Sequence, residues 1–208
     1  PPGTGKTTWA RVLGELANAE FLQVNAIDTG AKDIREIGLR AYRQRVEQQR
    51  RTVLFIDEIH RLNRSQQDVL LPFTEKGDII LIGATTENPS YELNSALLSR
   101  SQVLVFDRFT EEDLKSILER AAKNLEFTLE KALTENSVQA IIEAADGDAR
   151  KLLNIVETLN ETVELKTVES PLEVEALKEA LANRTFRFDK KGESHYDTIS
   201  AFIKSIRG

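Results

Sequence analysis

The sequence contains no cysteine and only two histidines among its 208 residues. Without cysteine there can be no disulfide framework and no thiolate metal site, and two histidines argue against a zinc site. No apolar run approaches the ~20 residues of a membrane span, and no signal peptide precedes the first motif. These absences exclude a disulfide-stapled or membrane-spanning protein and fit a cytoplasmic setting.

The sequence also lacks an excess of positive charge, since 28 Lys and Arg stand against 34 Asp and Glu and the formal net charge is −6. A protein that binds nucleic acid over its whole surface is usually basic, so any contact with DNA must be local. The favoured interpretation of the one basic cluster is a solvated helix face, with DNA contact as the alternative. The cluster consists of Arg40, Arg43, Arg45, Arg50 and Arg51, with Lys32 and Arg35 nearby.

Methionine is also missing, so Pro1 is not a translation start, and we expect an internal fragment of a longer protein. In its first half, short apolar runs at 21–24, 53–56, 79–82 and 103–106 have strand character. Helical stripes alternate with them, the first beginning near Lys6 and carrying Trp9, which we expect in the core. Alternating strands and helices predict an α/β fold with a parallel, helix-covered sheet.

After Asp107 the sequence pattern changes from alternating strands and helices to helices alone. Thr110 to Asp113 is typical of a capping box that opens a helix. Apolar residues then recur at helical spacing up to about residue 183, and no strand interrupts them. We therefore predict an α/β core over 1–107, an all-helical lid domain over 108–183, and a linker over 184–208 that leads to a missing oligomerisation domain.

The first residues match most of a phosphate-binding loop, whose pattern is G-x-x-x-x-G-K-[ST]. Gly5, Lys6 and Thr7 supply its end, and the leading glycine would stand just before Pro1. Glycines let backbone N–H groups point at phosphate oxygens, and the following helix presents its positive end. We predict that Lys6 reaches the phosphates of ATP and that Thr7 binds Mg²⁺. The other predicted nucleotide contacts are Pro2, Gly3, Thr4 and Thr8. The alternative is a glycine-rich turn that only caps a helix.

Two carboxylates follow the apolar run 53–56. Open α/β sheets bind ligands at the carboxyl ends of their strands, where Asp57 and Glu58 are expected. Asp57 would bind Mg²⁺, and Glu58 would orient and polarise the attacking water as general base. A strand that merely ends in an acidic turn is the alternative, and the pairing with Lys6 favours the catalytic interpretation. We expect His60 to be a surface or helix-start residue.

These motifs resemble the AAA+ superfamily of P-loop ATPases, and longer runs narrow the resemblance. The run 82–100 (IGATTENPSYELNSALLSR) and the run 195–208 (HYDTISAFIKSIRG) are similar to the replication-associated recombination protein A family. This family is also called the maintenance of genome stability ATPases, and its eukaryotic members are the Werner helicase-interacting ATPases. The resemblance spans essentially the whole chain, and it includes 33–36, 56–61, 65–68 and 147–150.

The resemblance assigns further residues. It implies that Thr86, rather than Thr85, is the sensor 1 residue that detects the γ-phosphate. Arg100 matches the arginine finger, which completes the site of a neighbouring subunit and is worth on the order of 10³–10⁵ in rate. Arg150 matches sensor 2, carried by the lid, where the preceding Asp148 is expected to cap a helix. A weaker match places Asn25 where related ATPases restrain the catalytic glutamate.

The resemblance also implies the function. Family members hydrolyse ATP with Mg²⁺ as homotetramers that act on single-stranded, gapped or forked DNA, with single-stranded-DNA-binding protein as a partner, in the bacterial cytoplasm at the nucleoid. Alternatives are a clamp-loader or Holliday-junction motor subunit and a non-catalytic ATP-binding scaffold. Because a core strand, a glycine and the assembly region would be missing, we expect the isolated chain to hydrolyse ATP poorly.

Overall fold

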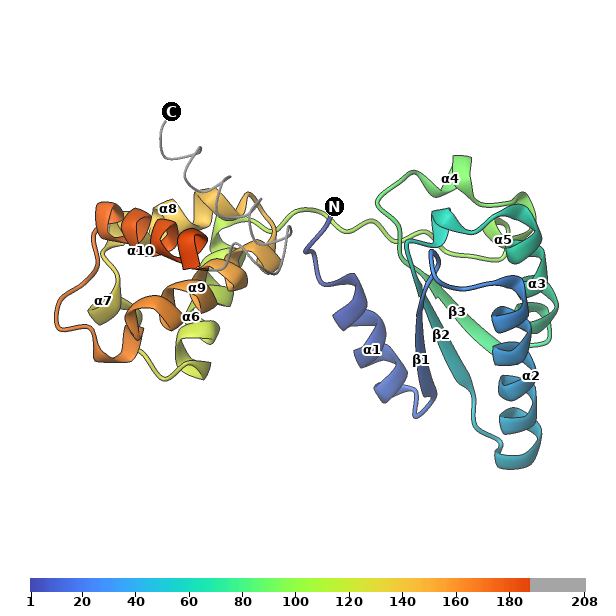
Figure 1. Cartoon of the computed structure of the whole chain (residues 1–208). Coiled ribbons are helices and arrows are strands. Elements are labelled where there is room, and N and C mark those ends of the chain that lie inside the picture. Colours follow the sequence, from blue (N-terminus) through green and yellow to red (C-terminus); the bar gives the residue numbers. More distant parts are fainter. Residues whose placement is uncertain (188–208) are drawn as a thin grey trace. The chain divides into compact units, whose positions relative to one another are not determined.

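The computed structural model describes residues 1–187, which divide into two compact units. One unit comprises residues 5–105 and contains the sheet, and among the described residues the other comprises 1–4 and 106–187. Figure 1 shows the elements of each unit in sequence colours. Within the described residues, no helix is both long and apolar enough to cross a membrane.

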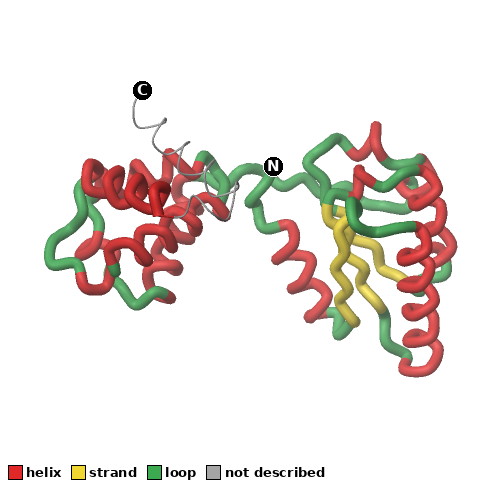
Figure 2. Tube along the Cα trace, viewed as in Figure 1, coloured by secondary structure: helices red, strands yellow, loops and turns green. Residues whose placement is uncertain are grey.

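The sheet of the first unit is parallel. Strands β1 (Glu20–Asn25), β2 (Thr52–Asp57) and β3 (Ile79–Gly83) lie in the order β1-β2-β3. Their register places Val53 between Phe21 and Ile80. The three parallel strands, yellow in Figure 2, thus all end at the same edge of the sheet, its carboxyl edge. This arrangement confirms the predicted parallel α/β fold.

Helices cover both faces of this sheet. Helix α1 (Lys6–Leu16) packs on one face, where Ala10 contacts the cluster around Phe55. Helices α2 (Ala31–Gln48) and α3 (Arg64–Glu75) pack on the other, over Leu54 and Ile56. Successive side chains of a strand point to opposite faces, so β2 supplies both cores. The connections after β2 and β3 contain η1 (Ile59–Arg61), α4 (Pro89–Glu92) and α5 (Ser95–Leu98).

Burial follows from position in the sheet. All residues of β2 from Thr52 to Ile56 are buried, as expected of a central strand covered on both faces. Strand β3 is an outer strand with a neighbour on one side only, and Ile80 is 36% exposed. The predicted strand at 79–82 is therefore present, but it is covered less completely than β2.

Two predictions were wrong. Residues 103–106 form no strand, and Val103, Leu104 and Val105 are exposed, because no described strand pairs with this segment. Strand propensity yields a strand only where a neighbouring backbone completes the ladder. Trp9 is 40% exposed rather than in the core, because α1 packs on the sheet with the face of its small residues Ala10 and Gly14.

The second unit is helical. Its helices α6 (Glu111–Asn124), α7 (Leu129–Ala132), α8 (Glu135–Ala145), α9 (Ala149–Val163), η2 (Leu165–Thr167) and α10 (Val174–Arg187) enclose one core. Leu118, Ile141 and Leu152 are completely buried there. The predicted capping box is confirmed, since the Thr110 side chain accepts a hydrogen bond from Asp113 N–H and Asp113 accepts one from Thr110 N–H.

The predicted boundaries differ from the observed units in two places. Residues 1–4 group with the helical unit through Gly3, whose carbonyl accepts a hydrogen bond from Ala149 N–H at 3.2 Å. Helix α10 continues to Arg187, four residues past the predicted end at 183, because the change to a polar composition does not stop a helix. The rest of the predicted linker, with the run 195–208, lies outside the described residues.

Candidate functional site

The two predicted carboxylates stand at the carboxyl end of β2. Asp57 is the last residue of the strand, opposite Asn25 in the register, and its Oδ1 accepts a hydrogen bond from Glu58 N–H at 3.2 Å. Glu58 then turns out of the strand with φ 52° and ψ 43°, a left-handed conformation that only a few per cent of non-glycine residues adopt. Such strain is of order 1–3 kcal/mol and persists where the surrounding structure enforces it.

The surrounding structure here is a pair of backbone hydrogen bonds beyond the strand ends. Ala84 N–H donates to Ile56 C=O at 2.9 Å, and Ile59 N–H donates to Ala84 C=O at 2.9 Å. The connection after β2 therefore stays paired with the end of β3. This pairing brings Glu58 and Thr85 to the same edge of the sheet, and Thr86, which is exposed, follows directly.

The side chain of His60 joins these two segments. We expected a surface or helix-start residue; the helix start is confirmed, because His60 belongs to η1, but the side chain is not on the surface. It is only 7% exposed, and Nδ1 lies 2.9 Å from Thr85 Oγ1 and 3.3 Å from Glu58 Oε2. Sequence reasoning missed this arrangement. The available signal was the parallel order of the two strands, which brings the residues after each strand together.

The start of α1 is suited to an anion. Its N-cap is Gly5, with φ 81°, which provides no side-chain cap, and the first turn of the helix contains no acidic residue. By contrast, the N-cap side chains of α3, α6, α8 and α9 all accept hydrogen bonds from backbone N–H groups. A Cβ built on Gly5 would meet no atom within 4 Å, so there is open space at this end. These features fit a phosphate group.

Lys6 and Thr7 open the same helix. Because α1 descends along the sheet and connects directly to the start of β1, its N-terminus lies toward the carboxyl ends of the strands (Figure 1). Thr7 offers a hydroxyl oxygen and Asp57 a carboxylate, which are the donors that Mg²⁺ prefers. No three acidic or histidine side chains gather anywhere in residues 1–187, so Mg²⁺ would need phosphate and water oxygens as further ligands.

Most of the other predicted nucleotide contacts lie in the helical unit. Pro2 is exposed, Gly3 has φ 64°, and the buried Thr4 donates from Oγ1 to Pro1 C=O at 3.1 Å. Arg150 is exposed on the first turn of α9, and its N–H donates to Asp148 Oδ1 at 2.8 Å. The predicted cap by Asp148 is thereby confirmed. Thr8 belongs to α1 of the sheet unit and is exposed.

Arg100 follows α5 on the surface of the sheet unit. Its guanidinium lies 3.0 Å from Glu75 Oε1 and donates to Ala96 C=O, also at 3.0 Å. Both partners of the ion pair are about half exposed, so the pair contributes roughly 0–1 kcal/mol. Arg100 is therefore held in place only weakly and can exchange Glu75 for another anion.

Asn25 does not contact Glu58 in any described interaction. Its Oδ1 accepts a hydrogen bond from Ile27 N–H at 3.0 Å, and its carbonyl accepts one from Thr29 Oγ1 at 2.6 Å. Both bonds stabilise the turn that follows β1. In this conformation Asn25 serves its own loop, whereas the Glu58 carboxylate lies 3.3 Å from His60 Nδ1.

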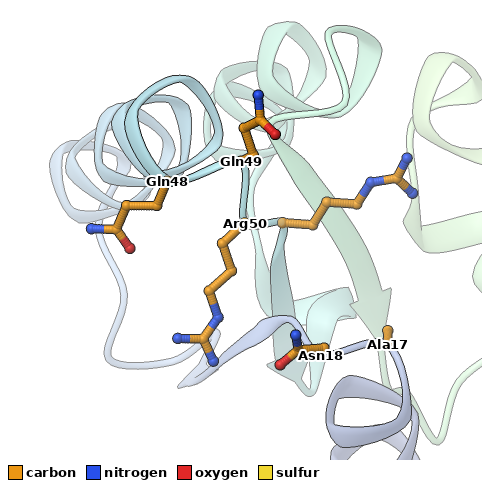
Figure 3. Close-up of a pocket in the computed structure, with 6 residues that line it drawn as sticks. Ala17, Asn18, Gln48, Gln49 and Arg50 are labelled. Carbon is orange, nitrogen blue, oxygen red and sulfur yellow. The ribbon is translucent and has the colours of Figure 1, made fainter.

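The basic cluster is partly structural. Arg40 pairs with Glu20, and Arg45 Nε lies 2.7 Å from the buried Asp78. Near Arg50 and Arg51 is a hollow of about 520 Å³, lined also by Ala17, Asn18, Gln48 and Gln49 (Figure 3). Its lining residues directly precede β1 and β2, so it lies at the amino ends of the strands. Asp57 and Glu58 are at the opposite edge, so the hollow does not coincide with the predicted nucleotide site.

Comparison with known proteins places these motifs in context. Residues 1–109 match the family described as ATPase family associated with various cellular activities (AAA), and residues 127–207 match the AAA C-terminal domain. The chain is 46% identical to replication-associated recombination protein A of Haemophilus influenzae and 45% identical to that of Escherichia coli. Both alignments cover 100% of this chain and 47% of the relative, so the chain spans about half the length of these curated relatives.

Other relatives are more distant. ATPase WRNIP1 of Dictyostelium discoideum is 39% identical over 100% of this chain and 26% of its own length. Among solved structures, the RuvB Holliday junction branch migration motor of Thermotoga maritima superposes with a TM-score of 0.69 at 24% identity, covering 88% of this chain and 59% of that chain. Domain III of the DnaA replication initiation protein of the same organism gives 0.62 at 19% identity, over 87% and 80%. At these identities the two structures show a shared fold alone.

Proposed function

The chain belongs to the replication-associated recombination protein A family of AAA+ ATPases, and on that premise we propose that the protein hydrolyses ATP to act on DNA at replication forks or gaps. The observation that carries the proposal is the arrangement at the carboxyl edge of the sheet. Glu58 leaves β2 in a left-handed conformation beside Asp57, at the edge toward which the uncapped N-terminus of α1 points.

The proposed chemistry assigns one task to each side chain. Glu58 orients water and accepts its proton. Lys6 and the N–H groups of α1 bind the phosphates, and Thr86 contacts the γ-phosphate. Bound Mg²⁺, held by Thr7 and Asp57, would neutralise charge on the phosphate oxygens. The contacts of Pro2, Gly3, Thr4 and Thr8 with the nucleotide belong to the same proposal.

Two arginines complete the proposed site. Arg100, loosely held by Glu75, reaches the nucleotide of a neighbouring subunit, where its charge offsets the negative charge that develops on the transferred phosphate. Arg150, on the first turn of α9, is assigned to the γ-phosphate as the sensor 2 residue. An arginine supplied in trans requires an oligomer, and a homotetramer is the assembly that the family resemblance implies.

The remaining parts of the proposal concern the setting. The names of the relatives support a role in replication and recombination. The family resemblance adds single-stranded-DNA-binding protein as a proposed partner and a bacterial cytoplasmic, nucleoid-associated location. A clamp-loader or Holliday-junction motor is the weaker alternative, because the likeness to RuvB is one of fold at 24% identity whereas the likeness to replication-associated recombination protein A reaches 46%. Processive clamp loading or branch migration by the full-length protein would favour that alternative.

The decisive variants are Glu58→Gln and Lys6→Ala in the full-length protein. Glu58→Gln should bind ATP like the wild type and lose turnover by about 10²–10⁴-fold, because the general base is gone. Lys6→Ala should weaken ATP binding itself. ATP binding and phosphate release are measured on the same preparations. If Glu58→Gln leaves turnover unchanged, the non-catalytic scaffold becomes the better account.

A further inference from the structure

The ring of His60 occupies a position between the catalytic strand and its neighbour. His60 belongs to η1, the short helix that begins directly after Glu58. Its side chain is 93% covered, since 7% of the surface is exposed. Only Nδ1 makes a described polar contact, and it faces both Thr85 Oγ1, at 2.9 Å, and Glu58 Oε2, at 3.3 Å. A histidine that only filled space would not need to direct the same nitrogen at a carboxylate and a hydroxyl.

The ring is held on the Thr85 side. Thr85 Oγ1 accepts a hydrogen bond from Glu87 N–H at 2.9 Å, which orients the hydroxyl toward Nδ1. The bond between Ile59 N–H and Ala84 C=O fixes the backbone of the residue before His60. Gly83 makes this approach possible, because a Cβ there would lie 2.6 Å from Ile59 Cδ1. Consequently, the position of Nδ1 is set by the end of β3.

The contact between His60 and Glu58 depends on which tautomer the His60 ring adopts. An ionised carboxylate only accepts hydrogen bonds, so Nδ1 attracts Glu58 Oε2 only when Nδ1 carries a proton. The Thr85 hydroxyl can then accept a share of the same N–H. In the opposite tautomer Nδ1 accepts from Thr85, and its lone pair faces the carboxylate without attraction. His60 can thus hold Glu58 or release it, depending on which partner Nδ1 serves.

We propose that His60 is a positioning residue for the Glu58 carboxylate and that Thr85 anchors it, so that the end of β3 controls the catalytic base. This inference rests on the proposed ATPase function. Asn25, the residue that the family resemblance suggested for this task, is engaged with its own turn through Ile27. Because Thr85 adjoins Thr86, a displacement of this segment moves the ring of His60 and with it the carboxylate.

The test uses steady-state kinetics of the full-length protein. His60→Ala should lower kcat about 10- to 100-fold, the usual effect of losing a residue that orients another. KM and ATP affinity should stay within about twofold, because the phosphate contacts remain. His60→Asn should retain most of the activity, because the amide nitrogen of Asn is bonded to Cγ and can take the place of the histidine Nδ1. His60→Gln, which reaches only the Nε2 position, should behave like His60→Ala.

Combining substitutions of His60 and Glu58 distinguishes a positioning role of His60 from a merely structural one. In a Glu58→Gln background, His60→Ala should cause no further loss of turnover, because residues that act as a unit are non-additive. Thr85→Val should lower kcat in the same direction and should add little to His60→Ala. Arg61→Ala, which alters an exposed side chain of the same turn, is the matched control and should leave kcat unchanged.

The outcomes distinguish this inference from the proposed function. If the wild type turns over ATP, Glu58→Gln is inactive and His60→Ala keeps its full kcat, the inference alone is wrong. It is equally wrong if His60→Asn is as impaired as His60→Ala, or if ATP affinity and melting temperature fall in parallel with kcat. If Glu58→Gln itself turns over ATP like the wild type, the proposed function fails first.

Discussion

Arginine 45 illustrates how single residues divide between structural and functional roles. Its guanidinium pairs with Asp78, whose side chain is 2% exposed, whereas Arg43 on the same helix is exposed and has no ion pair among the described residues. Sequence alone could only group the arginines of 40–51 as one basic face. Their separate roles depend on carboxylates that are distant in the chain, and spacing along a helix does not reveal these.

This difference leads to a stability prediction. Arg45→Ala leaves the buried carboxylate of Asp78 without its partner, so the free energy of unfolding should fall by about 2–4 kcal/mol. Arg43→Ala is the matched control and should change it by less than about 0.5 kcal/mol. Urea unfolding of both variants measures the difference. Equal effects of the two substitutions would mean that the pair with Asp78 contributes nothing.

The same reasoning explains which site residues were predictable. Lys6, Thr7, Asp57 and Glu58 belong to motifs in which a local pattern specifies the chemistry, and their roles remain predictions that the geometry supports. His60 belongs to no such motif. Its contact with Thr85 arises from strand order, which becomes visible only when β2 and β3 are placed side by side.

At the scale of elements, amphipathic patterns located the helices and strands well but did not give their burial. The apolar stripe of α1 that includes Trp9 predicts a core face. The buried face is instead that of Ala10 and Gly14, because these small residues let the helix approach the rings of Phe21 and Phe55. Likewise, residues 103–106 have the composition of a strand but no partner among the described strands. Packing partners, not composition, decide both cases.

Helix α6 offers a prediction about pH. The pKa of Asp113 is lowered from its ordinary value, first by the hydrogen bond from the Thr110 hydroxyl and then by that from the Thr110 N–H. A lowered folded-state pKa stabilises the fold above the unfolded pKa, and this contribution is lost as pH falls through the folded pKa. Asp113→Asn should therefore lower the melting temperature at pH 7, and the difference from the wild type should shrink in acid.

The control for this prediction is Glu112→Gln in the same first turn. Glu112 is exposed and takes part in no described capping bond, so its effect should be smaller at pH 7 and should change less with pH. Thermal melting followed by circular dichroism, at pH 7 and at several lower pH values, compares the three proteins. A deficit of Asp113→Asn that stays constant down to strongly acidic pH would contradict the role of the ionised carboxylate.

At the scale of the whole molecule, the sequence was most informative about class and least informative about boundaries. The alternation of strands and helices followed by helices alone predicts an α/β unit and a helical unit, and both are present. The assignment of residues 1–4 to the helical unit was not predictable, because it depends on the bond from Ala149 N–H to Gly3 C=O, which joins residues far apart in the chain.

The residues assigned to the proposed activity are divided between the two units. Glu58, Lys6 and Arg100 come from the sheet unit, whereas Arg150 and Gly3 come from the helical unit. An arginine that acts on a neighbouring subunit makes turnover depend on assembly. For this reason the central claim is best tested on the full-length protein rather than on either unit.

The most direct measurement is the ATPase rate of the full-length protein, with and without gapped or single-stranded DNA, beside its Arg100→Ala variant. We predict that DNA raises the rate and that Arg100→Ala lowers it by about 10³-fold or more. Arg64→Ala, an exposed arginine of α3, serves as the control and should behave like the wild type. A wild-type rate that DNA does not change, together with full activity of Arg100→Ala, would contradict the proposed function.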